Sequence, residues 1–151
     1  MRFKSLPNAK RYPTTAFEWD TLLARHREIT DYVLLPGAPC QLFVLSAAPT
    51  TPAFAGLSLR QIRMPYGWRN FRFMDGGNMH TVERRWNFIV FEQLLRLRAD
   101  DRIGPVGVWN PARQIIYSPY DGGADIYSAD VDLAHKISAK FSRWRMAPYP
   151  D

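Results

Sequence analysis

The chain has 151 residues, which fits a single domain with room for a substantial core. Its composition, 46% hydrophobic and 14% aromatic, excludes a disordered chain, and no apolar run is long enough to span a bilayer. The net charge is +6 at pH 7, and arginine supplies sixteen of the twenty basic residues. This excess indicates either an acidic partner or a solvated basic surface.

The first thirteen residues are predicted to form an irregular arm that ends at Tyr12-Pro13. Thr15-Ala16-Phe17-Glu18 fits a capping box, so a helix is expected to begin there. Its apolar stripe consists of Phe17, Leu22, Ile29 and Val33, widened by Trp19, Leu23 and Tyr32. Pro36-Gly37 ends the helix. The basic start of the chain lacks an apolar h-region, so no signal peptide is expected.

Short apolar runs between turn signals predict the strands. Gln41–Ala47 is typical of a buried strand. Two further strands, 66–74 and 79–86, are joined by the turn Asp75-Gly76-Gly77-Asn78. Toward the end of the chain, Val106–Trp109 and Gln114–Tyr117 form a predicted hairpin, and Ala124–Tyr127 follows as another strand.

Residues 88–98 fit two structures. Phe88-Ile89-Val90-Phe91 alone favours a strand, whereas the longer window has helical spacing and good helix formers. We choose a helix with Asn87 as its N-cap. A last helix is predicted from the N-cap Asp130 to about Trp144. Its apolar stripe consists of Val131, Leu133, Ala134, Ile137 and Phe141.

The order of these elements predicts an α+β fold, with a single, mostly antiparallel β-sheet packed by about three helices. Consecutive strands joined by tight turns favour antiparallel pairing, and helices between groups of strands favour packing on one sheet. The whole chain, 1–151, is predicted to be one domain, with 1–13 as its N-terminal arm.

The positive charge is concentrated in residues 58–113, which hold ten arginines against five acidic residues. Between Arg60 and Phe73 arginine alternates with aromatic residues, a mixture enriched in protein interfaces and able to stack bases. An amphipathic strand with its aromatics in the core fits the same pattern. Because no nucleic-acid-binding signature is present, a protein partner is preferred. The candidate partner-binding residues are Arg63, Tyr66, Trp68, Arg69, Arg72, Arg85 and Trp86.

A second candidate is the turn Tyr120-Asp121-Gly122-Gly123-Ala124-Asp125. Adjacent glycines permit positive φ, and an Asp before them can bond its own turn amides, so a structural turn is the first interpretation. The alternative is a polar surface site made of Tyr120, Asp121 and Asp125. The spacing does not fit an EF-hand loop.

Histidine and cysteine are too few and too scattered in the sequence for a metal site. His26 and His135 are predicted to be ordinary surface residues of the first and last helices. His80 and Glu83 are expected on opposite faces of one strand, because an odd offset reverses the side chain. Cys40, at the start of a buried strand, is interpreted as a structural thiol. No cofactor and no metal are expected.

Three stretches carry a family resemblance: 94–103, 116–126 with its Pro-Tyr-Asp-Gly-Gly-Ala-Asp core, and Phe141-Ser142-Arg143-Trp144 with Pro148 and Pro150. Trp68-Arg69 matches as well. Together they resemble a family of small bacterial domains of unknown function. The resemblance assigns no catalytic residue. It implies a cytoplasmic protein, and because similar small domains accompany secreted toxins, it implies an immunity role by analogy.

Three functional hypotheses follow. The first is a small cytoplasmic protein-binding domain, an immunity protein that neutralises a toxin or effector by direct contact with an acidic surface of that partner. The second is a nucleic-acid-binding or regulatory protein that uses the same arginines, whose binding would weaken with salt. The third is an enzyme centred on Tyr120, Asp121 and Asp125. No membrane partner is expected. An effector exported without a cleaved signal would have the same sequence features as a cytoplasmic protein.

Overall fold

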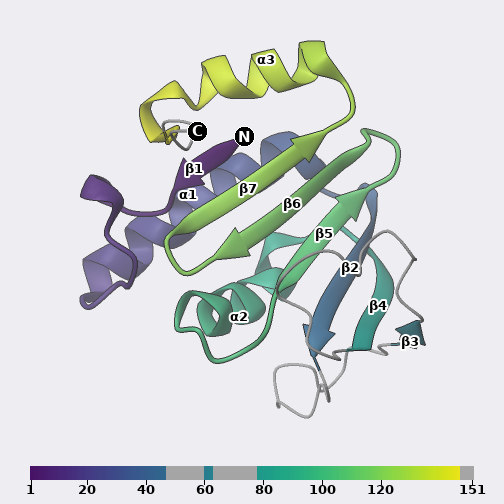
Figure 1. The fold of residues 1–151 in the computed structure, drawn as a ribbon, viewed down its shortest axis with the longest axis horizontal. Coiled ribbons are helices and arrows are strands. Elements are labelled where there is room, and N and C mark those ends of the chain that lie inside the picture. Colours follow the sequence, from purple (N-terminus) through teal and green to yellow (C-terminus); the bar gives the residue numbers. More distant parts are fainter. Residues whose placement is uncertain (47–59, 63–77, 147–151) are drawn as a thin grey trace.

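The computed structural model describes residues 1–46, 60–62 and 78–146. These residues form one antiparallel sheet of seven strands in the order β1-β7-β6-β5-β2-β4-β3, with three α-helices (Figure 1). The predicted α+β fold is therefore confirmed. The strands are β1 (Arg2–Lys4), β2 (Pro39–Ser46), β3 (Arg60–Ile62), β4 (Asn78–Arg85), β5 (Val106–Asn110), β6 (Ile115–Tyr120) and β7 (Gly123–Ser128). The helices are α1 (Ala16–Leu34), α2 (Phe88–Ala99) and α3 (Val131–Lys140), with short 3-10 turns η1 (Pro7–Ala9) and η4 (Ser142–Trp144).

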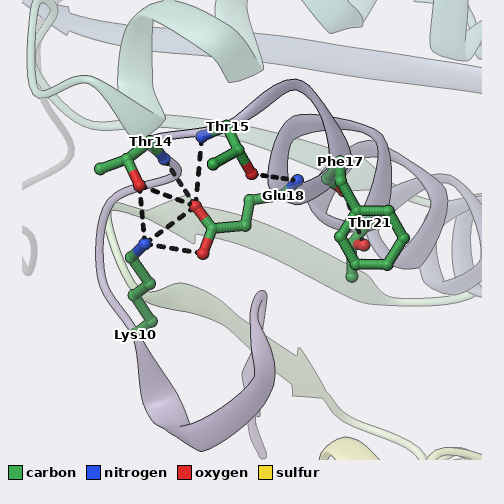
Figure 2. Close-up of polar contacts among 6 residues, drawn as sticks. All are labelled: Lys10, Thr14, Thr15, Phe17, Glu18 and Thr21. Carbon is green, nitrogen blue, oxygen red and sulfur yellow. Dashed lines mark hydrogen bonds and ion pairs between the residues drawn. The ribbon is translucent and has the colours of Figure 1, made fainter.

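The capping box predicted at the start of α1 is present and is reinforced by a lysine (Figure 2). Thr15 accepts from the Glu18 backbone N–H at 3.2 Å, while the Glu18 carboxylate accepts from the backbone N–H groups of Thr14 and Thr15. Lys10 Nζ donates to the same carboxylate at 2.6 Å. The lysine hydrogen bond, followed by that from Thr14, lowers the pKa of Glu18 to about 2. The ion pair between Lys10 and Glu18 thus links the N-terminal arm to α1.

Phe17 does not belong to the buried stripe of α1, contrary to expectation. It is 77% exposed, whereas Leu22, Ile29 and Val33 are buried. A helix turns about 100° per residue. Leu22, Ile29 and Val33 therefore fall within a narrow sector, and Phe17 lies about 140° away from Leu22. The same geometry explains Val131 on α3, predicted to be apolar core and found 66% exposed.

The N-terminal arm is more regular than predicted. Residues 2–4 form β1, which pairs with β7 so that Arg2 lies opposite Asp125 and Lys4 opposite Gly123. Phe3, between them, is 1% exposed and contacts Phe141 edge-on at 6.1 Å. A three-residue strand with one inward side chain has too little alternation to be recognised in a sequence.

Two further differences are that β3 was not predicted and that α3 ends at Lys140, with η4 in place of its expected last turn. The remaining described strands and helices follow the prediction closely. The hairpin β5–β6 and the returning strand β7 lie where expected, and β2 pairs with both β4 and β5. Residues 88–99 are helical, and Asn87 caps them by accepting from the Ile89 N–H at 2.9 Å. Asp130 caps α3 through the Leu133 N–H. The predicted strand 66–74 and residues 75–77 of its turn lie outside the described residues.

One face of the sheet carries the core. In β6, Ile115, Tyr117 and Pro119 are buried and alternate with half-buried residues. Helices α1 and α2 both contact β6 and lie behind the sheet in Figure 1. The alternate residues lie on the opposite face, here called the outer face, over which no described helix lies in that view. None of the helices within the described ranges is long and apolar enough to cross a membrane.

Candidate partner-binding surface

The structure places only part of the predicted partner-binding set. Five of its residues lie outside the described part of the chain: Arg63, Tyr66, Trp68, Arg69 and Arg72. Of the other two, Arg85 is the last residue of β4, and Trp86 lies between β4 and α2. These neighbours have opposite environments, since Arg85 is exposed and Trp86 is buried.

Trp86 belongs to the core and not to an exposed surface. It is 6% exposed, its ring lies 5.3 Å from that of Phe91, and its Nε1 donates to Asp31 at 3.2 Å. A buried tryptophan whose indole N–H donates to another part of the same chain connects the two segments that it contacts. Here it joins α1 to the start of α2, which corrects its predicted role as a surface anchor.

Arg85 is exposed at the end of β4. Its Nη1 donates to the Gly37 carbonyl at 3.0 Å, and no carboxylate among the described residues forms an ion pair with it. The sheet register places Arg85 opposite Pro39 on the outer face. Its guanidinium is therefore oriented by the backbone but keeps donors for an external acceptor.

A hollow of about 390 Å³ lies beside Arg85. Its walls come from the first residues of β2, the end of β4, and the end of β5 with the following turn. The lining residues are Pro39, Cys40, Gln41, Glu83, Arg84, Arg85, Trp109 and Pro111. A cavity of this size can take one or two side chains of a partner, or a small ligand.

Trp109 is the aromatic residue of this hollow and does not belong to the predicted partner-binding set. The residue is 40% exposed because β5 turns Val106, Val108 and Asn110 toward the core and Trp109 outward. Trp109 lies opposite Gln41 on one side and Ile116 on the other. The signal was available in the sequence, since a Trp between two inward positions of a strand must face outward.

The register continues this row across the outer face. Glu83, Gln41, Trp109, Ile116 and Tyr127 are successive cross-strand neighbours on β4, β2, β5, β6 and β7. Tyr127, at the far end, is 52% exposed. The hollow is therefore one end of a band of polar, aromatic and aliphatic side chains.

The thiol of Cys40 in the hollow is not a reactive group. Burial raises the pKa of Cys40 to about 11, so the thiol stays protonated at neutral pH. Its predicted structural role is consistent with its burial. In the part of the chain that the structure describes, no group of three or more His, Cys, Asp or Glu side chains could hold a metal ion.

The predicted turn site is bound to the N-terminal arm. The Asp121 carboxylate, 11% exposed, accepts from Arg11 and from the Tyr12 hydroxyl, and not from its own turn amides. Asp125 accepts from Arg2 Nε at 2.9 Å. Both carboxylates thus hold the arm on the sheet, which favours the structural interpretation of the turn.

The rest of the motif packs around these pairs. Tyr120 donates to Met146 Sδ at 3.5 Å and lies under the Arg2 guanidinium. Neither Gly122 nor Gly123 has positive φ, contrary to expectation. Gly123 is needed for space, because a Cβ there would overlap the Phe3 carbonyl oxygen. The turn serves close strand approach and not an unusual backbone conformation.

A buried hydrogen-bonded chain links Ser5, His26 and Tyr117. His26 Nε2 lies 2.6 Å from Ser5 Oγ, and Nδ1 bonds the Tyr117 hydroxyl. His26 is 2% exposed, so the predicted surface position is wrong. A Ser–His pair can be a nucleophile and its base, but Ser5 is also 2% exposed and Tyr117 is completely buried. The chain joins the arm, α1 and β6.

The other histidines agree with expectation. His80 faces Val44 on the core side of β4, whereas Glu83 faces Gln41 on the outer face. His135 is exposed on α3.

Comparison with known proteins identifies a family whose function is unknown. A family model described as a domain of unknown function, DUF3885, matches residues 1–148. The match extends well upstream of residue 94, where the strongest sequence resemblance begins. No curated protein and no solved structure matches the chain.

Proposed function

Since the chain belongs to the DUF3885 family, a domain family of unknown function, we propose from its own surface that it is a protein-binding domain. The hollow beside Arg85 would receive an acidic segment of the partner. The observation that carries this proposal is the half-exposed Trp109 next to an arginine that has no carboxylate partner in the described chain.

Tryptophan and arginine are the residues that most often dominate the binding energy of protein interfaces. In this hollow the indole supplies apolar area, Arg85 supplies donors for a carboxylate, and Gln41 adds a neutral hydrogen-bonding group. Pro39 and Pro111 give the walls little conformational freedom to lose on binding.

The charge around the hollow favours a protein over a nucleic acid. Glu83 lies in the same wall as Arg84 and Arg85. A carboxylate at that position would repel the continuous charge of a phosphate backbone, whereas a protein segment can direct one carboxylate to Arg85 and a hydrogen-bond donor to Glu83. The net charge of +6 keeps nucleic acid as the second candidate, with salt-sensitive binding as its signature.

A more specific version of this proposal is that the protein is an immunity protein. In it, the partner is a toxin or secreted effector with an acidic surface, and this protein neutralises it by direct contact in the cytoplasm. The support for this role is an analogy, since small domains similar to those of the resembled family accompany secreted toxins. The single, buried Cys40 suits a reducing compartment.

The test is co-expression and co-purification with the product of the neighbouring gene, followed by affinity measurement. Trp109→Ala and Arg85→Glu should each weaken the complex by roughly tenfold or more. Phe17→Ala removes an exposed aromatic ring from α1, and Arg102→Glu reverses an exposed charge elsewhere, so both should bind normally. A complex that is insensitive to Trp109 and Arg85, or no complex at all, would reject the proposal.

Binding to single- and double-stranded nucleic acid should be measured in parallel at low and physiological salt. Binding that falls steeply with salt and is lost in Arg85→Glu would favour the second candidate over the first.

A further inference from the structure

A second cluster of arginines lies away from the hollow, where α1 meets η4. Arg25 of α1 and Arg143 of η4 lie over the same indole ring, that of Trp144. Their Cζ atoms are 5.3 Å and 4.6 Å from the ring centroid. Trp144 is itself buried and stacks on Phe141 at 5.6 Å. Trp144 belongs to the terminal motif Phe141-Ser142-Arg143-Trp144, which has no part in the proposed function.

Arg25 has no counter-charge in the described chain. No described carboxylate forms an ion pair with it, and its buried Nη1 has no hydrogen-bond partner. Burial, and then the charge of Arg143, lower the pKa of Arg25. An unsatisfied charged donor in a desolvated position costs free energy. The fold therefore tolerates two neighbouring positive charges at this place.

Arg143 is accessible and loosely held. Its side chain is 71% exposed, and its Nη2 lies 3.9 Å from the half-exposed Glu28 carboxylate. At that distance the pair is a weak, solvent-screened contact and not a hydrogen bond. An incoming anion could replace Glu28 as the acceptor without disturbing the core.

We propose that Arg25 and Arg143, held on Trp144, form a binding site for an oxyanion, a phosphate or a carboxylate group. The anion would bridge the two guanidiniums, with Arg143 as the outer, bidentate donor and the exposed part of Arg25 as the inner one. It would supply the negative charge that the described residues do not give Arg25. This site is separate from the hollow and does not depend on the proposed function.

Isothermal titration calorimetry of the full chain tests the site, with inorganic phosphate and sodium acetate as probes at constant ionic strength. Saturable binding is expected for the natural sequence. Arg25→Gln and Arg143→Gln should each weaken it by roughly tenfold or more. Arg27→Gln removes an equal charge from α1 at an arginine paired with Asp31, so its binding should be unchanged.

The two probes separate the sources of the anion. Binding of phosphate alone would identify a phosphate site, and comparable binding of acetate would identify a carboxylate site. Because Arg143 is exposed, its Gln variant remains informative even if Arg25→Gln is poorly folded. Absence of saturable binding for both probes, or equal binding by Arg143→Gln and the natural sequence, would overturn the proposal.

Discussion

The backbone carbonyl of Phe3 occupies the space that a side chain on Gly123 would need. The two residues belong to adjacent strands, with Phe3 of β1 opposite Ala124 and Lys4 opposite Gly123. The glycine therefore allows the start of the chain to pair with the last strand. Phe3 then places its ring in the core against Phe141. Gly123 of the motif thus supports strand pairing between β1 and β7.

Gly123→Ala is expected to lower the free energy of unfolding by about 2 kcal/mol or more, because its Cβ meets backbone and β1 must move away. Thermal unfolding followed by circular dichroism measures the change. Gly122→Ala is the matched control, since the atom nearest to its Cβ would be Arg11 Cγ at 3.5 Å and its φ is not positive. Equal unfolding temperatures for the two variants would contradict this account of the motif.

Helices and strands whose ends are marked by residues close together in the chain were predictable from the sequence. The capping box at Thr15, the N-caps Asn87 and Asp130, and the hairpin from Val106 to Tyr117 all depend on neighbours in the chain, and the structure has them. The burial of a residue was predictable only where the apolar side chains follow a regular helical or strand spacing. Phe17 failed because five positions along a helix do not return to the same face.

Contacts between distant segments could not be predicted from one sequence. The arm is held by Asp121 and Asp125, more than a hundred residues away, and His26 is buried by Ser5 and Tyr117. Nothing near His26 in the chain signals these partners. Trp109 is different, because the alternation of side chains within β5 is enough to predict that it faces outward.

Asn110 joins the end of β5 to the end of α1, and its replacement should be costly. It is completely buried, donates from Nδ2 to the Leu34 carbonyl at 2.7 Å, and accepts from the Arg113 N–H at 3.1 Å. Asn110→Asp keeps the shape but turns a second acceptor toward Leu34 and buries a charge. We expect a loss of about 3 kcal/mol or more in urea unfolding.

Asn110→Ala is the comparison for this prediction. It removes both hydrogen bonds without adding charge, so its loss should be smaller, about 2 kcal/mol. An Asp variant as stable as the Ala variant would show that the Leu34 contact does not require a donor.

The hydrogen bond from Tyr12 to Asp121 should be visible in the titration of the phenol. That hydrogen bond is the main reason why the pKa of Tyr12 is raised above 10.0, and the charge of Arg11 opposes the rise. Asp121→Asn should therefore lower the pKa of Tyr12, and Arg11→Gln should raise it. Carbon-13 NMR of labelled tyrosine, assigned with Tyr12→Phe, measures both shifts. Shifts of the same sign in the two variants would contradict the arrangement.

His26 should make stability depend on pH in a range where carboxylates contribute little. Burial, and then the charge of Arg25, lower the pKa of His26 to about 3, against 6.5 for a free histidine. Between these values the unfolded chain binds a proton that the folded chain does not. The stability conferred by neutral His26 is therefore complete above pH 6.5 and is lost as the pH falls toward 3.

At pH 5 this difference corresponds to about 2 kcal/mol of lost stability relative to pH 7. Glu18, with its pKa lowered from 4.5 to about 2, loses its stabilising effect only at lower pH and does not interfere there. His26→Gln should flatten the pH dependence of urea unfolding between pH 7 and 5, whatever its absolute stability. His135→Gln removes an exposed histidine from α3 and should keep the slope of the natural sequence. If His26→Gln kept that slope as well, the buried histidine would not be the group that senses this range of pH.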